Sequence, residues 1–171
     1  MFYKNERAVS SLVATVLLIL ITVAAVGIIW GAIMPMLNSA MEIGQACLNA
    51  RLTIDTTSGY TCYKTTTNEV MIMVGRGAEE FYLAGMSLII SGGGQSKTFQ
   101  FKQGAAIGGV KMIDGTTTIQ LPSTNEERTY LLFIGTNLTS VEEAKVAPIA
   151  RVGKTDRACD VSSKVPLTIC S

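Results

Sequence analysis

Residues 9–37 read VSSLVATVLLILITVAAVGIIWGAIMPML, a run without a single charged residue. It exceeds the ~20 apolar residues that an α-helix needs to cross a bilayer. A helix over residues 9–46 would be roughly 55 Å long at ~1.5 Å per residue, against a hydrocarbon core of ~30 Å. We therefore expect a membrane-crossing helix over residues 9–46, kinked at Pro35, whose C-terminal part projects from the bilayer. Because the projecting part is still rather apolar, it needs protein to cover it.

Charged residues lie just before this run. Lys4 and Arg7 lie on the short N-terminal side, and positive residues favour the cytoplasmic face, so residues 47–171 should lie outside the cell. A secretory signal places its small-residue cleavage site after the apolar run. Here the charged-charged-small triplet Glu6-Arg7-Ala8 stands before it. A peptidase cutting between Ala8 and Val9 would leave the helix as the new N-terminus, with anchoring intact.

Small residues recur along the predicted helix at spacings of three to four. Small side chains on one helix face let backbones approach closely in an apolar medium, and Gly27 and Gly31 form a GxxxG spacing. Gly and Ala are also common in membrane helices that make no such contact. The candidate packing positions are Ala24, Gly27, Gly31, Ala40 and Gly44.

The stretch NERAVSSLVATVLLILITVAAVGII, residues 5–29, resembles the N-terminal segment of archaeal type IV pilins. In that family a short, positively charged leader precedes a small residue and a mature helix with a start similar to Val-Ser-x-Leu-x-Ala. Archaeal flagellins share this leader logic but usually begin with a Gly-rich start, which is missing here. The resemblance covers about a fifth of the chain and favours the adhesive-pilus branch.

The resemblance implies a processing and assembly route. A prepilin peptidase would remove the leader, residues 1–8, recognising Glu6, Arg7, Ala8 and Val9. The remaining helices would then leave the cytoplasmic membrane, with the help of pilus assembly machinery, and pack with identical subunits into a helical filament on the cell surface. A helix that is apolar all round is stable both in lipid and in a bundle of like helices. The implied function is a structural subunit with a role in adhesion.

Residues 47–171 predict an all-β head domain, so the fold class expected is α+β. Period-two alternation replaces the long apolar run, and turn residues recur roughly every 8–12 positions, which is typical of an antiparallel sandwich. Gly92-Gly93-Gly94 indicates a hairpin. Residues 74–90 also resemble the early strands of immunoglobulin-like domains. Strands are expected in ARLTID, EVMIMVGR, FYLAGMSLIIS, KTFQFK, GVKMI, TTIQL, RTYLLFIG, KVAPIARVG and PLTIC.

The four cysteines all lie outside the apolar segment, at Cys47, Cys62, Cys159 and Cys170. An even number in an extracellular domain favours disulfides over free thiols. Three connectivities are open, and we expect the local pairing Cys47–Cys62 and Cys159–Cys170, with the second pair closing a C-terminal hairpin around Lys164-Val165. Asn137-Leu138-Thr139 is a glycosylation sequon in a turn.

No residue pattern predicts catalysis or metal binding. The chain has no histidine, which removes the commonest general base and zinc ligand, and its net charge of +1 gives no basic footprint for nucleic acid. The adjacent glutamates at 79–80, 126–127 and 142–143 predict solvated turns. We expect no cofactor and no enzyme. The alternatives that stay open are a non-polymerising single-pass surface protein with a ligand-binding β domain, and a minor pilin-like component of a secretion or uptake machine.

Overall fold

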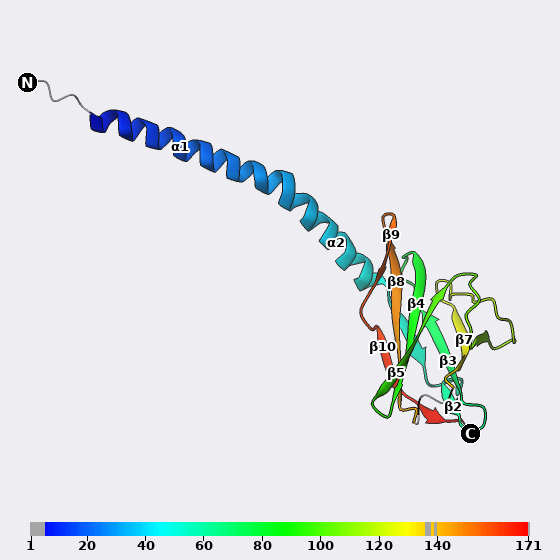
Figure 1. Cartoon of the computed structure of the whole chain (residues 1–171). Coiled ribbons are helices and arrows are strands. Elements are labelled where there is room, and N and C mark those ends of the chain that lie inside the picture. The colour runs from blue at the N-terminus through cyan, green and yellow to red at the C-terminus, as the bar shows by residue number, and fades with distance from the viewer. Residues whose placement is uncertain (1–5, 136–137, 139, 171) are drawn as a thin grey trace, which may run out of the picture. The chain divides into compact units, whose positions relative to one another are not determined.

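The computed structural model of the chain describes residues 6–135, 138 and 140–170, with side chains from Ser11 onward. It confirms the predicted α+β class: one long apolar N-terminal helix is followed by a β-rich region with two sheets (Figure 1). The helical part consists of α1 (Glu6–Ile28), a π-helical turn η1 (Ile29–Ile33) and α2 (Met34–Asn49). The chain forms two compact units, the helix up to Glu42 and the head from Ile43 onward.

The π-helical turn lies immediately before Pro35, where the sequence predicts an irregularity. Proline has no N–H to donate to the carbonyl four residues earlier, and its ring crowds that carbonyl. A wider turn with i→i+5 geometry separates these groups without ending the helix. The helix therefore passes through Pro35 and continues to Asn49.

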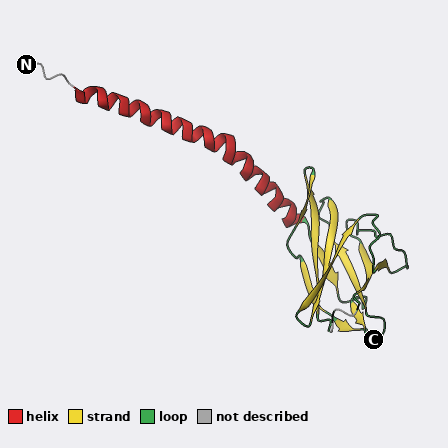
Figure 2. Ribbon diagram, viewed as in Figure 1, coloured by secondary structure: helices red, strands yellow, loops and turns green. Residues whose placement is uncertain are grey.

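The described residues of the head form eleven strands in two sheets. Figure 2 shows the strands in yellow. In the first sheet the order is β11-β2-β3-β7-β6, and β1 also pairs with β3; in the second it is β10-β8-β4-β5, and β9 also pairs with β8. The strands are β1 (Leu52–Asp55), β2 (Cys62–Lys64), β3 (Glu69–Arg76), β4 (Leu83–Gly92), β5 (Gln95–Lys102), β6 (Val110–Met112), β7 (Glu127–Phe133), β8 (Glu143–Val152), β9 (Thr155–Ala158), β10 (Ser163–Pro166) and β11 (Thr168–Ile169).

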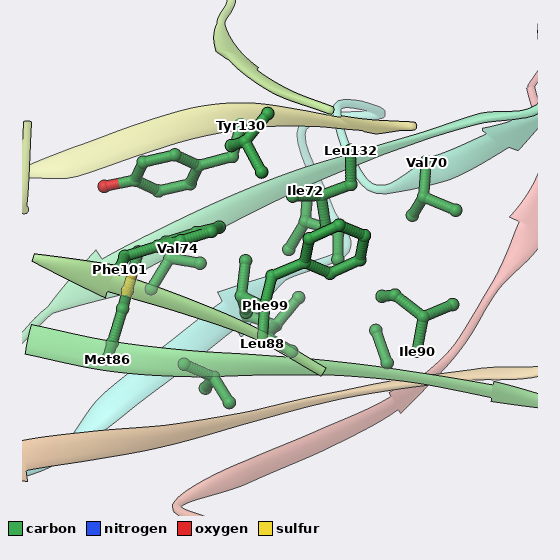
Figure 3. Packing of buried hydrophobic residues seen from close by; sticks show 14 of the residues in the cluster. Val70, Ile72, Val74, Met86, Leu88, Ile90, Phe99, Phe101, Tyr130 and Leu132 are labelled. Atoms are coloured by element: carbon green, nitrogen blue, oxygen red, sulfur yellow. The ribbon is translucent and has the colours of Figure 1, made fainter. Parts of the chain in front are cut away.

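The core lies between the two sheets and follows the predicted alternation. Along β3 the alternate residues Val70, Ile72 and Val74 are fully buried, whereas the residues between Val70 and Val74 are half-buried on the opposite face. Figure 3 shows these side chains from the first sheet directed toward those of β4 and β5. The rings of Phe101 and Tyr130 meet across the core with centroids 5.2 Å apart.

The predicted Gly92–Gly94 hairpin is confirmed. β4 and β5 pair antiparallel with Gly92 opposite Gln95, so Gly93 and Gly94 form a two-residue turn. Both have positive φ, 59° and 76°, as a type I′ turn requires. The strand expected in TTIQL is not confirmed: it forms no strand and contributes an isolated bridge between Thr118 and Ala106.

The expected C-terminal hairpin is wrong. β10 pairs antiparallel with β8, whereas β11 pairs in parallel with β2 in the other sheet. The chain changes sheets at Leu167, which is buried in the core and donates its N–H to the Glu142 carbonyl. Burial of this one leucine directs the two short strands to different sheets, and their separation along the chain gives no sign of it.

The expected local disulfides are wrong for the same reason. The bonds are Cys47–Cys159 and Cys62–Cys170. Parallel pairing of β11 with β2 brings Cys170 beside Cys62, with their Cα atoms 5.0 Å apart. Cys159 follows β9, at the end of a hairpin with β8, and bonds to Cys47 in the last turns of α2. Both bridges therefore join segments more than a hundred residues apart.

Candidate functional site

The most distinctive surface is the helix itself. It is apolar over Ser11–Asn49, long and apolar enough to cross a membrane, and none of its most apolar window is buried within the chain. Large side chains along it are largely exposed, for example Leu18 at 64% and Trp30 at 66%. Exposed apolar patches of more than a few hundred Å² mark sites of interaction with membrane or protein. The helix therefore presents an exposed apolar surface along most of its length.

The length of this surface exceeds what a bilayer covers. At ~1.5 Å per residue, its 39 residues extend for about 58 Å, against a hydrocarbon core of ~30 Å. A bilayer that covered the ~20 residues from Ser11 onward would not reach Met36, Leu37 and Met41, which are exposed at 76%, 51% and 59%. In that arrangement lipid alone would leave these side chains in water.

The small residues of the helix lie on two different faces. Ala24, Gly27 and Gly31 are three and four apart and share one face, and Ala40 and Gly44 share another. In a regular helix Gly31 and Ala40 would be about two and a half turns apart, so their side chains would point in opposite directions. The π turn between them changes this rotation about the helix axis by roughly 100°. A Cβ built on Gly27, Gly31 or Gly44 would meet no atom within 4 Å. These positions have no packing role inside the subunit.

The predicted leader junction lies at the start of α1. The backbone of Glu6, Arg7, Ala8 and Val9 is helical, and their side chains lie outside the described residues. The sequon residue Asn137 also lies outside the described residues. Its neighbour Leu138 is buried in the core.

The last turns of the helix belong to the head. From Ile43 onward the helix acquires a partly buried face formed by Ile43, Ala46 and Cys47, and Ala50 just beyond it is fully buried. The Cys47–Cys159 bond fixes this face covalently.

The strand that follows the helix is held by two serines. Ser162 Oγ donates to the Leu52 carbonyl over 2.8 Å and accepts from the Leu52 N–H over 3.2 Å, and Ser163 Oγ accepts from the Ile54 N–H. Sequence reasoning missed both serines, since nothing in their local pattern indicates a partner more than a hundred residues away.

Several acidic residues of the head form local hydrogen bonds and ion pairs. Glu143 forms ion pairs with Lys145 at 2.7 Å and Lys164 at 2.6 Å, and hydrogen bonds from both lysines lower the pKa of the Glu143 carboxyl. The pKa of Asp55 falls from its ordinary 3.8 to about 2 because Thr57 and Ser58 donate hydrogen bonds to it. These interactions order turns and strand edges.

Within the described part of the chain, no group of three or more His, Cys, Asp or Glu residues is placed to hold a metal ion. All four cysteines are used in disulfides and do not ligate metal as thiolates. The surfaces that remain are suited to binding: an uncovered apolar helix and a cross-linked β head.

No model of a known protein family matches the sequence, and no curated protein resembles it closely enough to be reported as a relative.

Proposed function

We propose that this chain is the structural subunit of a cell-surface filament of the archaeal type IV pilus kind. In this proposal the helix is stored in the cytoplasmic membrane with its N-terminus inside, and it then polymerises with identical helices while the head coats the filament. The observation that carries the proposal is the apolar surface of the helix, which is uncovered as far as Glu42, while the helix as a whole is about twice as long as the hydrocarbon core of a bilayer is thick. Copies of the same helix cover that surface over its full length.

Three further features support this proposal. The charged-charged-small triplet before the helix places a cleavage site where cutting preserves the apolar segment. Two disulfides are typical of domains in oxidising surroundings outside the cytosol. The glycines of the helix are open to solvent within the subunit, which leaves them free for contacts with other helices.

The deciding experiment is electron microscopy of material sheared from cells that express the chain. Helical filaments composed of this chain, with a mature N-terminus at Val9 by peptide sequencing, are the expected result. Detergent-soluble monomers alone, with no filament under any condition, would instead favour a single-pass surface protein. A chain whose N-terminus is still Met1 within filaments would contradict the processing step.

A matched pair of variants tests helix packing. Gly31→Leu adds a large side chain where no atom of the subunit lies within 4 Å of the new Cβ, so the subunit should fold and enter the membrane normally. It should reduce filament yield strongly by separating the helices, whereas Gly31→Ala should reduce the yield much less. Equal filament yield from both variants would count against close packing at this position.

A further inference from the structure

Two arginines meet at one end of the β head. Arg76 ends β3 and continues the inward-facing series of Ile72 and Val74, and Arg128 on β7 lies opposite Val74 in the register. Both guanidinium groups are therefore directed toward the space between the two sheets, where a core residue would normally lie. Their Nε atoms are buried without a hydrogen-bond partner.

The two arginines differ in how their charge is balanced. Arg128 bonds to the Gln120 amide oxygen at 2.5 Å and pairs with Glu126. Among the described residues, Arg76 has no ion pair: it donates to the main-chain carbonyl of Phe81 and lies over the Phe81 ring, 4.2 Å from its centroid. Burial lowers the pKa of the Arg76 guanidinium, but arginine stays protonated in proteins. A partly desolvated cation without a counterion is costly, so this group favours an anion.

A cavity of about 300 Å³, which we call the Arg76 cavity, adjoins this group. It is lined chiefly by Arg76, Phe81, Tyr82, Gln103, Ser123 and Arg128. No acidic residue is part of the lining, although Glu126 lies next to it, paired with Arg128 and bonded to the Ser123 N–H. A second cavity of about 820 Å³ also borders Arg76, and there Glu79, Glu126 and Glu127 form part of the wall. The lining of the Arg76 cavity therefore favours an anion more than the lining of its neighbour does.

The other groups of the cavity favour a hydroxylated ligand. Gln103 accepts a hydrogen bond from the Leu121 N–H through its amide oxygen, so its NH₂ group remains available as a donor. Tyr82 is 61% exposed, although the guanidinium of Arg151 lies 4.5 Å from its ring centroid. An exposed aromatic ring with neighbouring polar groups is a usual element of small-molecule sites. One unbalanced guanidinium matches one carboxylate better than it matches a doubly charged phosphate.

We propose that the Arg76 cavity binds the carboxylate of an acidic sugar, a uronic acid. The carboxylate pairs with the Arg76 guanidinium, a hydroxyl accepts from the Gln103 amide, and the sugar ring lies against Tyr82. This site belongs to the head alone and does not depend on whether the helix polymerises. It supplies a chemical basis for contact between the head and acidic polysaccharide surfaces.

The test is calorimetric titration of the full chain in detergent micelles with D-glucuronate. D-glucose, which lacks the carboxylate, is the uncharged control ligand. Glucuronate should bind, more weakly as NaCl rises, and glucose should not. Arg76→Gln should weaken glucuronate binding tenfold or more, as expected for loss of a charge-assisted pair. Arg51→Gln removes the same charge outside the Arg76 cavity and should leave the affinity unchanged.

Several outcomes would overturn the proposal. Equal weakening by Arg51→Gln and Arg76→Gln means that only overall charge matters. Acetate or inorganic phosphate binding as tightly as glucuronate rules out a sugar-acid site, as does the absence of any glucuronate binding. If circular dichroism shows that Arg76→Gln is unfolded, Tyr82→Ala serves instead, because this exposed ring is not part of the core. It should weaken glucuronate about fivefold, and an unchanged affinity would refute the site.

Discussion

The two disulfides are interlaced, and this arrangement predicts that their contributions to stability are not additive. The bonds join Cys47 to Cys159 and Cys62 to Cys170, so each bond has one cysteine inside the loop that the other closes. The perturbation is to replace each pair by alanine, singly and together, in the full chain. The double-variant cycle then isolates the coupling between the bonds.

The expected magnitudes follow from loop closure. Either bond alone closes a loop of more than a hundred residues, with separations of 112 and 108, and constrains the unfolded chain by about 4.8 kcal/mol. When the other bond is present, the shortest covalent path between the cysteines is only about 26 residues, and the added constraint is about 3.5 kcal/mol. Each single pair of replacements should therefore cost about 3.5 kcal/mol, and the double replacement about 8.3 kcal/mol.

The assay is guanidinium chloride unfolding in detergent micelles, followed by the circular dichroism of the strands, with an osmolyte added equally to all samples. The double variant should lose about 1.3 kcal/mol more than the sum of the two single variants. The free energy lost with the packing of the sulfur atoms is the same in the double variant as in the sum of the two single variants, so it cancels in this comparison. The local pairing would give independent costs of about 3.0 and 2.8 kcal/mol with no excess. Additive costs within about 0.5 kcal/mol would refute the interlaced arrangement.

Two further predictions concern the head. Gly92→Ala should cost about 3 kcal/mol in unfolding free energy, because its Cβ would lie 2.1 Å from the Ser140 carbonyl oxygen. Gly94→Asn is the control that the fold should tolerate, because Gly94 has a positive φ, which asparagine can adopt, and open space around it. Equal losses of unfolding free energy in the two variants would contradict the clash at Gly92. The pKa of Asp55, lowered from 3.8 to about 2, contributes stability above pH 3.8 that is lost as pH falls through 2. The melting temperature of the native chain should therefore approach that of Asp55→Asn between pH 4 and pH 2, and a constant difference would show that this carboxylate does not contribute.

The features that the sequence predicts well are those set by local pattern. An uninterrupted apolar run allows only a helix in lipid, because every backbone group must be satisfied within the segment. The burial alternation of β3 and the Gly93-Gly94 turn are likewise determined by the residues of those segments themselves. The pairing predictions failed where the segments are short and their partners are distant in sequence. β10 and β11 are only four and two residues long, so long-range burial of Leu167 decides their sheets.

The pairing of the cysteines and the Arg76 cavity could not be predicted from the sequence for one and the same reason. Each depends on which ends of distant strands meet: Cys170 bonds to Cys62, 108 residues away, and Arg76 lies on the same face as Arg128 of β7. A guanidinium at the end of an alternating apolar strand is indistinguishable, in sequence, from an ordinary solvated charge at a strand end. Only the register between β3 and β7 shows that Arg76 and Arg128 share the inner face.

The first disulfide, which lies within the head unit, connects the last turns of the helix to a distant part of the head sequence. The helix enters the head through its last turns, and Cys47 is attached there to Cys159, at the far end of the head sequence. A pull on the helix is therefore transmitted through a covalent bond to the segment after β9, and not through β1 alone. β1 has four residues and pairs in its sheet only with β3, and its main chain also bonds to Ser162 and Ser163. A monomeric anchor that carries no load gains little from this attachment. A subunit held in a filament by its helix gains a covalent connection to its head in addition to the pairing of β1.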